Sequence, residues 1–246
     1  MLDGVQMSIL LPAFAAGMLV LATHVPLGAE VLKRGIIFID LAIAQIAGLG
    51  IVVANVLGVE MHGWQAQLAA VTAALGGALF LRWVERKVPE QQEAIIGVCF
   101  VVAASAAILL MSKDPQGGEH LRELLVGQIL WSTWEGLIPL AIATATVLVA
   151  WFGLRLKASP LGFYVVFAVT VTASVQVVGV YLVFASLIVP ALSAGGRPWI
   201  APMVGVAGYG LGLLASAIFD LPAGAAIVLA LAAAGVILAF RKPVAS

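Results

Sequence analysis

The stretch of sequence that decides the fold runs from residue 158 to residue 196 and reads ASPLGFYVVFAVTVTASVQVVGVYLVFASLIVPALSAGG. Its 39 residues include no charged side chain. A single helix of that length, at about 1.5 Å per residue, would be nearly twice as long as the hydrocarbon core of a bilayer is thick. The stretch therefore predicts either one very long helix or two short helices that break near Gly179.

The whole chain is more apolar than a soluble protein. Of its 246 residues, 63% are hydrophobic and only 10% are charged, whereas a soluble domain carries roughly 25% charged residues. Too few polar side chains remain to cover a water-exposed surface, so lipid must surround most of the protein. Twelve basic and twelve acidic residues cancel, and this balance argues against a nucleic-acid partner. The single cysteine, Cys99, permits no intramolecular disulfide and no thiolate metal cluster.

Seven further stretches have the length and apolar character of membrane-crossing helices, which need about 20 residues each. They are approximately residues 8–29, 36–58, 64–83, 94–112, 134–154, 199–219 and 221–240. With the central stretch split into two short or broken spans at about 162–178 and 180–194, the sequence predicts an all-α integral membrane protein. We expect a polytopic helical bundle of about nine spans that forms a single transmembrane domain over residues 1–246.

The basic residues favour the split and set the orientation. With the amino terminus outside and the central stretch split, only Lys113 and Arg122 lie outside. The other ten lie on the cytoplasmic side: Lys33, Arg34, Arg82, Arg86, Lys87, Arg155, Lys157, Arg197, Arg241 and Lys242. Without the split the ratio falls to seven against five, so the positive-inside rule predicts a cytoplasmic carboxyl terminus. The tryptophans fall near span ends, as in an interfacial belt: Trp64, Trp83, Trp131, Trp134, Trp151 and Trp199.

Several catalytic motifs are missing from the sequence. It contains no GxxxxGK[ST] phosphate loop, so any ATP must be hydrolysed by another chain. It also contains neither HExxH nor GxSxG, which argues against hydrolytic enzymes. We therefore expect this chain itself not to be an enzyme.

Asp40 is the strongest candidate for a functional residue within the membrane. It is expected about 6 Å inside a span that begins at Ile36, and ionisable groups at lipid depth are functional candidates by default. A structural role is equally open, because Asp40 could cap the positive helix end or pair with Arg34 or Lys33. Gln45 follows one turn later and adds an amide to the same span.

Further donors lie elsewhere. His24, near the inner end of the first span, could be a ligand or a hydrogen-bonding residue between helices. Two outer loops carry nitrogen and oxygen donors that could form a weak metal access site, or could simply be solvated. These loop donors are Glu60, His62, Glu119, His120 and Glu123.

Three stretches together resemble a known family. They are LKRGIIFIDLAIAQ at 32–45, LLVGQILW at 124–131 and VVGVYLVFASLIVPALSA at 177–194. In this order they resemble the permease subunits of zinc- and manganese-type ABC importers, the ABC-3 family. The resemblance extends over about residues 30–200.

The resemblance implies a homodimeric, multi-pass permease in the inner membrane that moves a divalent metal ion into the cytoplasm. Zinc is the first candidate for that ion, with manganese and iron next. The chain itself would bind no cofactor, since ATP would be bound by a separate cytoplasmic subunit. An extracytoplasmic metal-binding protein would deliver the ion.

The resemblance also assigns residues. Such permeases carry a basic pair, an aspartate and then usually a histidine in the second span, and Arg34 and Asp40 match this pattern. Ala44 stands where the histidine is expected, so Gln45, or His24 if the first span packs against the second, would complete the metal pathway. ATPase docking would use the short loop after the fifth span together with residues 82–93: Arg82, Arg86, Lys87, Arg155 and Lys157. Gly179 would be a hinge between two packings of the bundle.

Three other interpretations remain open from the residues alone. An ion-coupled secondary carrier would use Asp40 as its proton or cation site. An intramembrane enzyme acting on lipid would need more catalytic groups than Asp40 and His24 supply. A structural membrane subunit would need none of them.

Overall fold

The computed structural model describes residues 4–60, 63–112, 118 and 125–240. Within them the chain is helical and forms no strand. The helices are α1 (Gly4–Arg34), α2 (Ile39–Val56), α3 (Trp64–Lys87), α4 (Gln92–Met111), α6 (Leu137–Leu148), α7 (Pro160–Val178), α8 (Val180–Ala194), α9 (Ile200–Phe219) and α10 (Ala223–Phe240). Short turns of 3-10 helix lie at Pro89–Gln91, Ile129–Trp131 and Leu156–Ala158, and a π-helical turn at Val149–Gly153 continues α6.

Each of the nine expected spans coincides with one of these helices, which confirms the all-α bundle. Six are long and apolar enough to cross a membrane, namely α1, α2, α3, α4, α7 and α9. The other three, α6 with its π-helical turn, α8 and α10, are shorter apolar helices. The number of true crossings and the orientation in the membrane stay predictions.

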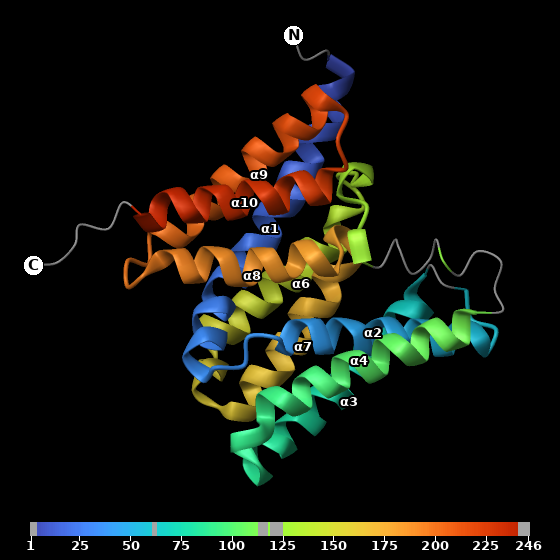
Figure 1. Ribbon diagram of the computed structural model, residues 1–246. Helices are drawn as coiled ribbons and strands as arrows, with labels where there is room; N and C mark the ends of the chain where they lie inside the picture. Colours follow the sequence, from blue (N-terminus) through green and yellow to red (C-terminus); the bar gives the residue numbers. More distant parts are fainter. Residues whose placement is uncertain (1–3, 61–62, 113–117, 119–124, 241–246) are drawn as a thin grey trace, which may run out of the picture.

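The helix ends separate into two groups in space. In Figure 1 the C-terminal ends of α1, α3, α8 and α10 lie toward the left and bottom, and those of α2, α4 and α9 lie toward the right and top. Lys33, Arg34, Arg82, Arg86, Lys87 and Arg197 lie near the C-terminal ends of α1, α3 and α8, which belong to the left and bottom group. Arg155 and Lys157 lie in the connection from α6 to α7, at the lower left of Figure 1. Lys113, Arg122, Arg241 and Lys242 lie outside the described residues.

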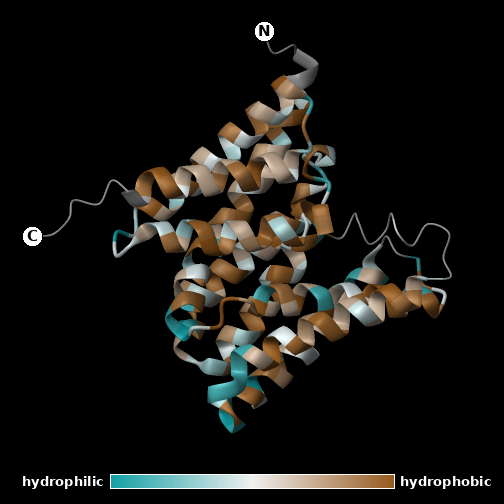
Figure 2. Ribbon diagram, viewed as in Figure 1, coloured by the Kyte–Doolittle hydropathy of each residue, from teal (hydrophilic) through white to brown (hydrophobic). Residues whose placement is uncertain are grey.

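The helix surfaces suit a lipid environment. Hydrophobic residues cover most of the length of the helices in Figure 2, and hydrophilic ones gather at helix ends. Five tryptophans are more than half exposed, as an interfacial belt requires, but Trp151 is 4% exposed. Its expected place in the belt is wrong because the π-helical turn directs it onto Phe163 of α7, with ring centroids 6.3 Å apart.

The central stretch breaks at Gly179, as the charge count favoured. Gly179 has φ 79° and ψ 161°, which only glycine adopts readily. A Cβ at this position would overlap the backbone of Val126 and Gly127, and Gly127 also has a positive φ of 71°. The Gln128 N–H donates to the Val177 carbonyl at 3.3 Å beside this contact. Two glycines therefore let the segment before α6 cross the α7–α8 break backbone against backbone.

The α1–α2 connection places Asp40 closer to a helix end than expected. Gly35, with φ 68°, ends α1, and the N–H groups of Gly35 and Ile36 donate to the carbonyls of Leu32 and Val31. This pattern is a Schellman motif. Because the motif turns the chain away from α1, α2 begins at Ile39 and not at Ile36, and Asp40 is its second residue.

Candidate functional site

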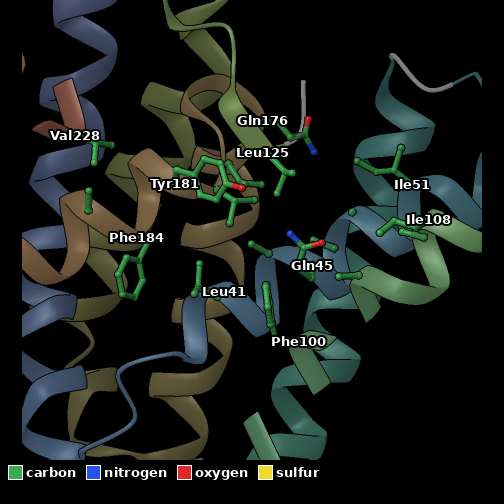
Figure 3. A pocket seen from close by; sticks show the side chains of 18 of the residues that line it. Leu41, Gln45, Ile51, Phe100, Ile108, Leu125, Gln176, Tyr181, Phe184 and Val228 are labelled. Carbon is green, nitrogen blue, oxygen red and sulfur yellow. The ribbon is translucent and has the colours of Figure 1, made fainter. Parts of the chain in front are cut away.

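A cavity of about 590 Å³ lies between two groups of helices. Residues of α2 and α4 line one side, residues of α8 and α10 line the other, and α7 contributes between them. Its wall is mainly apolar, but Gln45, Gln176 and Tyr181 bring polar groups to it. Figure 3 shows the Gln45 amide and the Tyr181 hydroxyl pointing into the space between the helices, with Gln176 and Leu125 at its upper edge.

Asp40 is buried at the start of α2, just before the residues of that helix that line the cavity. Leu41 and Ala44, which follow it on α2, line the cavity, while the Asp40 side chain is only 1% exposed. Neither carboxylate oxygen has a hydrogen-bond partner among the described residues. The N–H groups of Asp40 and Leu41 act favourably on the carboxylate as part of the helix N-terminus, but neither meets hydrogen-bond geometry.

The expectation that Asp40 could pair with Arg34 or Lys33 is wrong. Arg34 Nε lies 3.1 Å from Glu30, and its Nη1 lies 3.4 Å from Glu85 of α3. Lys33 is mostly exposed and approaches Glu30 at 3.9 Å. Both cations are thus held by other acids, and no described lysine or arginine forms an ion pair with the Asp40 carboxylate.

Glu93 is a second acid at this site, and it was not among the expected residues. It lies in the first turn of α4, and its Oε1 accepts a hydrogen bond from the Phe38 N–H at 3.3 Å. Its Oε2 is buried and has no partner among the described residues. Glu93 also repels the Asp40 carboxylate electrostatically. In sequence it resembles any acid at a helix start, so only its packing against α2 identifies it.

His24 is fully buried but lies apart from the cavity. Its Nδ1 donates to the Val20 carbonyl at 2.9 Å, which leaves Nε2 as a free acceptor without a partner among the described residues. α1 packs chiefly against α6, α8 and α9 and makes at most marginal contact with α2. The packing that would let His24 replace the missing histidine beside Asp40 is therefore absent from the described part of the chain.

The structure places only part of the other expected sites. Glu60 is exposed in the α2–α3 connection. The rest of the expected access site, His62, Glu119, His120 and Glu123, lies outside the described residues. Among described residues, no three of His, Cys, Asp and Glu converge on one point.

The expected docking residues differ in availability. Arg82 is bound to Glu85 at 2.7 Å and is mostly buried, whereas the other four are exposed: Arg86, Lys87, Arg155 and Lys157. They belong to the α3–α4 and α6–α7 connections, both of which lie toward the lower left of Figure 1.

Two polar residues of the cavity wall were not predicted from the sequence. Gln176 and Tyr181 flank Gly179, three residues before it and two after it. An amide in a stretch of otherwise apolar and small residues was the available signal for Gln176. Tyr181 carried no such signal, because its exposure depends on how α8 faces the cavity.

Two known membrane proteins are similar in sequence to this chain. The chain is 27% identical over 220 residues to a probable iron transport system membrane protein of Haemophilus influenzae, covering 78% of this chain and 79% of the relative. It is 26% identical over 229 residues to the manganese transport system membrane protein MntC of Halalkalibacterium halodurans, covering 82% and 77%.

The fold is shared with a solved structure. The chain superposes on a chain of PsaBC from Streptococcus pneumoniae in complex with Fab with a TM-score of 0.71, at 21% identity, covering 96% of this chain and 91% of the other. The sequence profile of the ABC 3 transport family matches residues 6–155 and 150–242, which together span nearly the whole chain. Because this profile matches nearly the whole chain, and because the helical bundle and the relatives agree with it, this chain belongs to the ABC 3 transport family.

Proposed function

We propose that the chain is the permease subunit of an ATP-driven importer that moves a divalent metal ion into the cytoplasm. The observation that carries the proposal is the Asp40 carboxylate, which is buried at the start of a helix that lines a cavity of about 590 Å³ and has no hydrogen-bond partner among the described residues. A buried carboxylate without a counter-charge is costly. It persists in a membrane bundle where a passing cation or proton balances it.

Membership of the ABC 3 transport family favours ATP over an ion gradient as the energy source. The sequence has no nucleotide-binding loop, so a separate cytoplasmic subunit would hydrolyse ATP. We place its docking surface on the α3–α4 and α6–α7 connections, where Arg86, Lys87, Arg155 and Lys157 are exposed. A metal-binding protein on the outer face and a second copy of this chain would complete the assembly in the bacterial inner membrane.

The donor set favours manganese over zinc. Asp40 and Gln45 offer only oxygen ligands, and Ala44 stands where an imidazole is usual in the family. Carboxylate and carbonyl oxygens suit manganese, while zinc binds preferentially to nitrogen and sulfur. Iron and manganese are also the metals named for the two relatives. We therefore rank manganese first and iron second, ahead of zinc.

The pathway would be occupied in steps. An ion released from the outer face enters the cavity, where an apolar wall holds it weakly and the Gln45 amide and Tyr181 hydroxyl can replace part of its water shell. Asp40 then provides the negative charge at the start of α2. Closure of the partner subunits on ATP would switch the bundle between its outward- and inward-facing packings, with Gly179 as the hinge.

The test is Asp40→Asn in proteoliposomes that also contain the partner ATPase, with Asp220→Asn as the matched control. Asp220 is an exposed residue in a turn, with a φ of 52° that asparagine tolerates. We expect Asp40→Asn to abolish ATP-dependent uptake of radioactive manganese while the chain elutes and unfolds as a folded protein.

Removing an unpaired buried charge should also leave the Asp40→Asn midpoint of thermal unfolding, measured without metal, equal to or above that of the wild type. Asp220→Asn should keep full uptake. Undiminished uptake by Asp40→Asn would return Asp40 to a structural role and remove the main support for this pathway.

A further inference from the structure

Asp40 and Glu93 occupy equivalent positions on two helices that pack together. Each is the second residue of its helix, α2 or α4, and these two helices are in extensive contact. The hydrogen bond from the Phe38 N–H to Glu93 Oε1 ties the start of α4 to the start of α2. Since Phe38 is only two residues before Asp40, this bond holds the Glu93 carboxylate at the start of α2, close enough to Asp40 for the two acids to interact electrostatically.

Three carboxylate oxygens at this junction are buried and unpartnered among the described residues. They are both oxygens of Asp40 and Oε2 of Glu93. No ion pair joins either acid to a described lysine or arginine, because the nearby Arg34 is held by Glu30 and Glu85. The positive ends of α2 and α4 offset only part of two like charges in a low-dielectric setting. A cation or a proton is therefore needed to neutralise the junction.

We propose that Glu93 is the second carboxylate of the Asp40 site, so that a divalent cation in transit is held between α2 and α4 by one acid from each helix. This inference rests on the proposed function and adds a residue to its pathway. The two carboxylates would neutralise the ion's double charge. Both ligands are carboxylate oxygens, which suit manganese.

A role of Glu93 as a simple helix-start acid is the competing explanation, and Glu93→Gln separates the two. The Gln amide oxygen can still accept the Phe38 N–H, so the structural hydrogen bond is kept while the charge is lost. Glu90→Gln is the matched control, because Glu90 lies three residues earlier in the same connection and is exposed.

The experiment measures Mn²⁺ binding to the purified full-length chain in detergent, from the loss of the free-ion electron paramagnetic resonance signal. We expect Glu93→Gln to bind Mn²⁺ at least about 10-fold more weakly than the wild type, because one of the two ligand charges is lost. Glu90→Gln should bind as the wild type does, and Asp40→Asn should show no binding. Glu93→Asp, which keeps the charge, should bind more tightly than Glu93→Gln. The midpoint of thermal unfolding without metal should not fall in Glu93→Gln.

The outcomes separate this inference from the proposed function. Wild-type affinity in Glu93→Gln, together with lost binding in Asp40→Asn, would overturn the role of Glu93 and leave Asp40 in place. Wild-type affinity in Asp40→Asn would overturn the proposed pathway itself. If the wild type bound no Mn²⁺, the two-carboxylate site would be refuted, while the uptake assay would still judge transport independently.

Discussion

Gly179→Ala tests the backbone crossing at the centre of the fold. The wild-type residue has φ 79° and ψ 161°, and a side chain in this region costs about 1–3 kcal/mol. The new Cβ would also overlap the backbone of Val126 and Gly127. Backbone atoms cannot rotate away, so overpacking adds about 1–3 kcal/mol. The free energy of unfolding should therefore fall by about 2–6 kcal/mol.

The assay is thermal unfolding in detergent, followed by tryptophan fluorescence. At about 2 °C or more per kcal/mol for a chain of this length, the midpoint should fall by about 4 °C at least. Gly76→Ala is the control, because Gly76 lies within α3 and a Cβ there meets nothing within 4 Å. Its midpoint should stay level or rise, since alanine favours helix. Equal midpoints for Gly179→Ala and the wild type would show that the two segments do not cross in close contact.

Two further substitutions probe the interior and the inner end of the bundle. Arg34→Met should lower the free energy of unfolding by about 1–3 kcal/mol, because it leaves Glu30 and Glu85 without their shared cation. Arg86→Met, at an exposed position, is the control and should change the midpoint of thermal unfolding little. Equal effects of the two substitutions would show that the ion pairs of Arg34 do not stabilise the fold. Tyr209→Phe should cost about 1 kcal/mol by removing the buried 2.9 Å hydrogen bond with Ser186. Tyr181→Phe, which changes a residue of the cavity wall, should leave the midpoint of thermal unfolding unchanged. If Tyr181→Phe lowered the midpoint as much as Tyr209→Phe does, the cost could not be assigned to the Tyr209–Ser186 hydrogen bond.

Local sequence was sufficient to predict the helices and the break between α7 and α8. The length of the charge-free stretch and the positions of basic residues favoured a split near Gly179, and α7 ends at Val178. The reason for a glycine at that point was not predictable. It depends on Gly127, which is distant in sequence and meets Gly179 only through tertiary packing.

The site was predictable in part. Asp40 stood out because acids are rare at lipid depth, and the structure does bury it. Its lack of a partner depends on Glu85, which lies 51 residues from Arg34 and holds that cation. Glu93 was missed for a similar reason, because its proximity to Asp40 arises from the packing of α4 on α2. Sequence identified the acid, but only the fold shows which groups surround it.

Under the proposed function, ATP drives the import of a metal ion through this chain. The most direct test reconstitutes the chain in proteoliposomes with the ATPase that co-purifies from its native membrane and supplies the metal-binding protein outside. Uptake of manganese, iron and zinc would be measured with and without ATP on the ATPase side. We expect the metal ion to accumulate inside the proteoliposomes only with ATP, most strongly for manganese, and not to accumulate with Asp40→Asn. Uptake that does not depend on ATP and follows a proton gradient would refute ATP-driven import and identify an ion-coupled carrier instead.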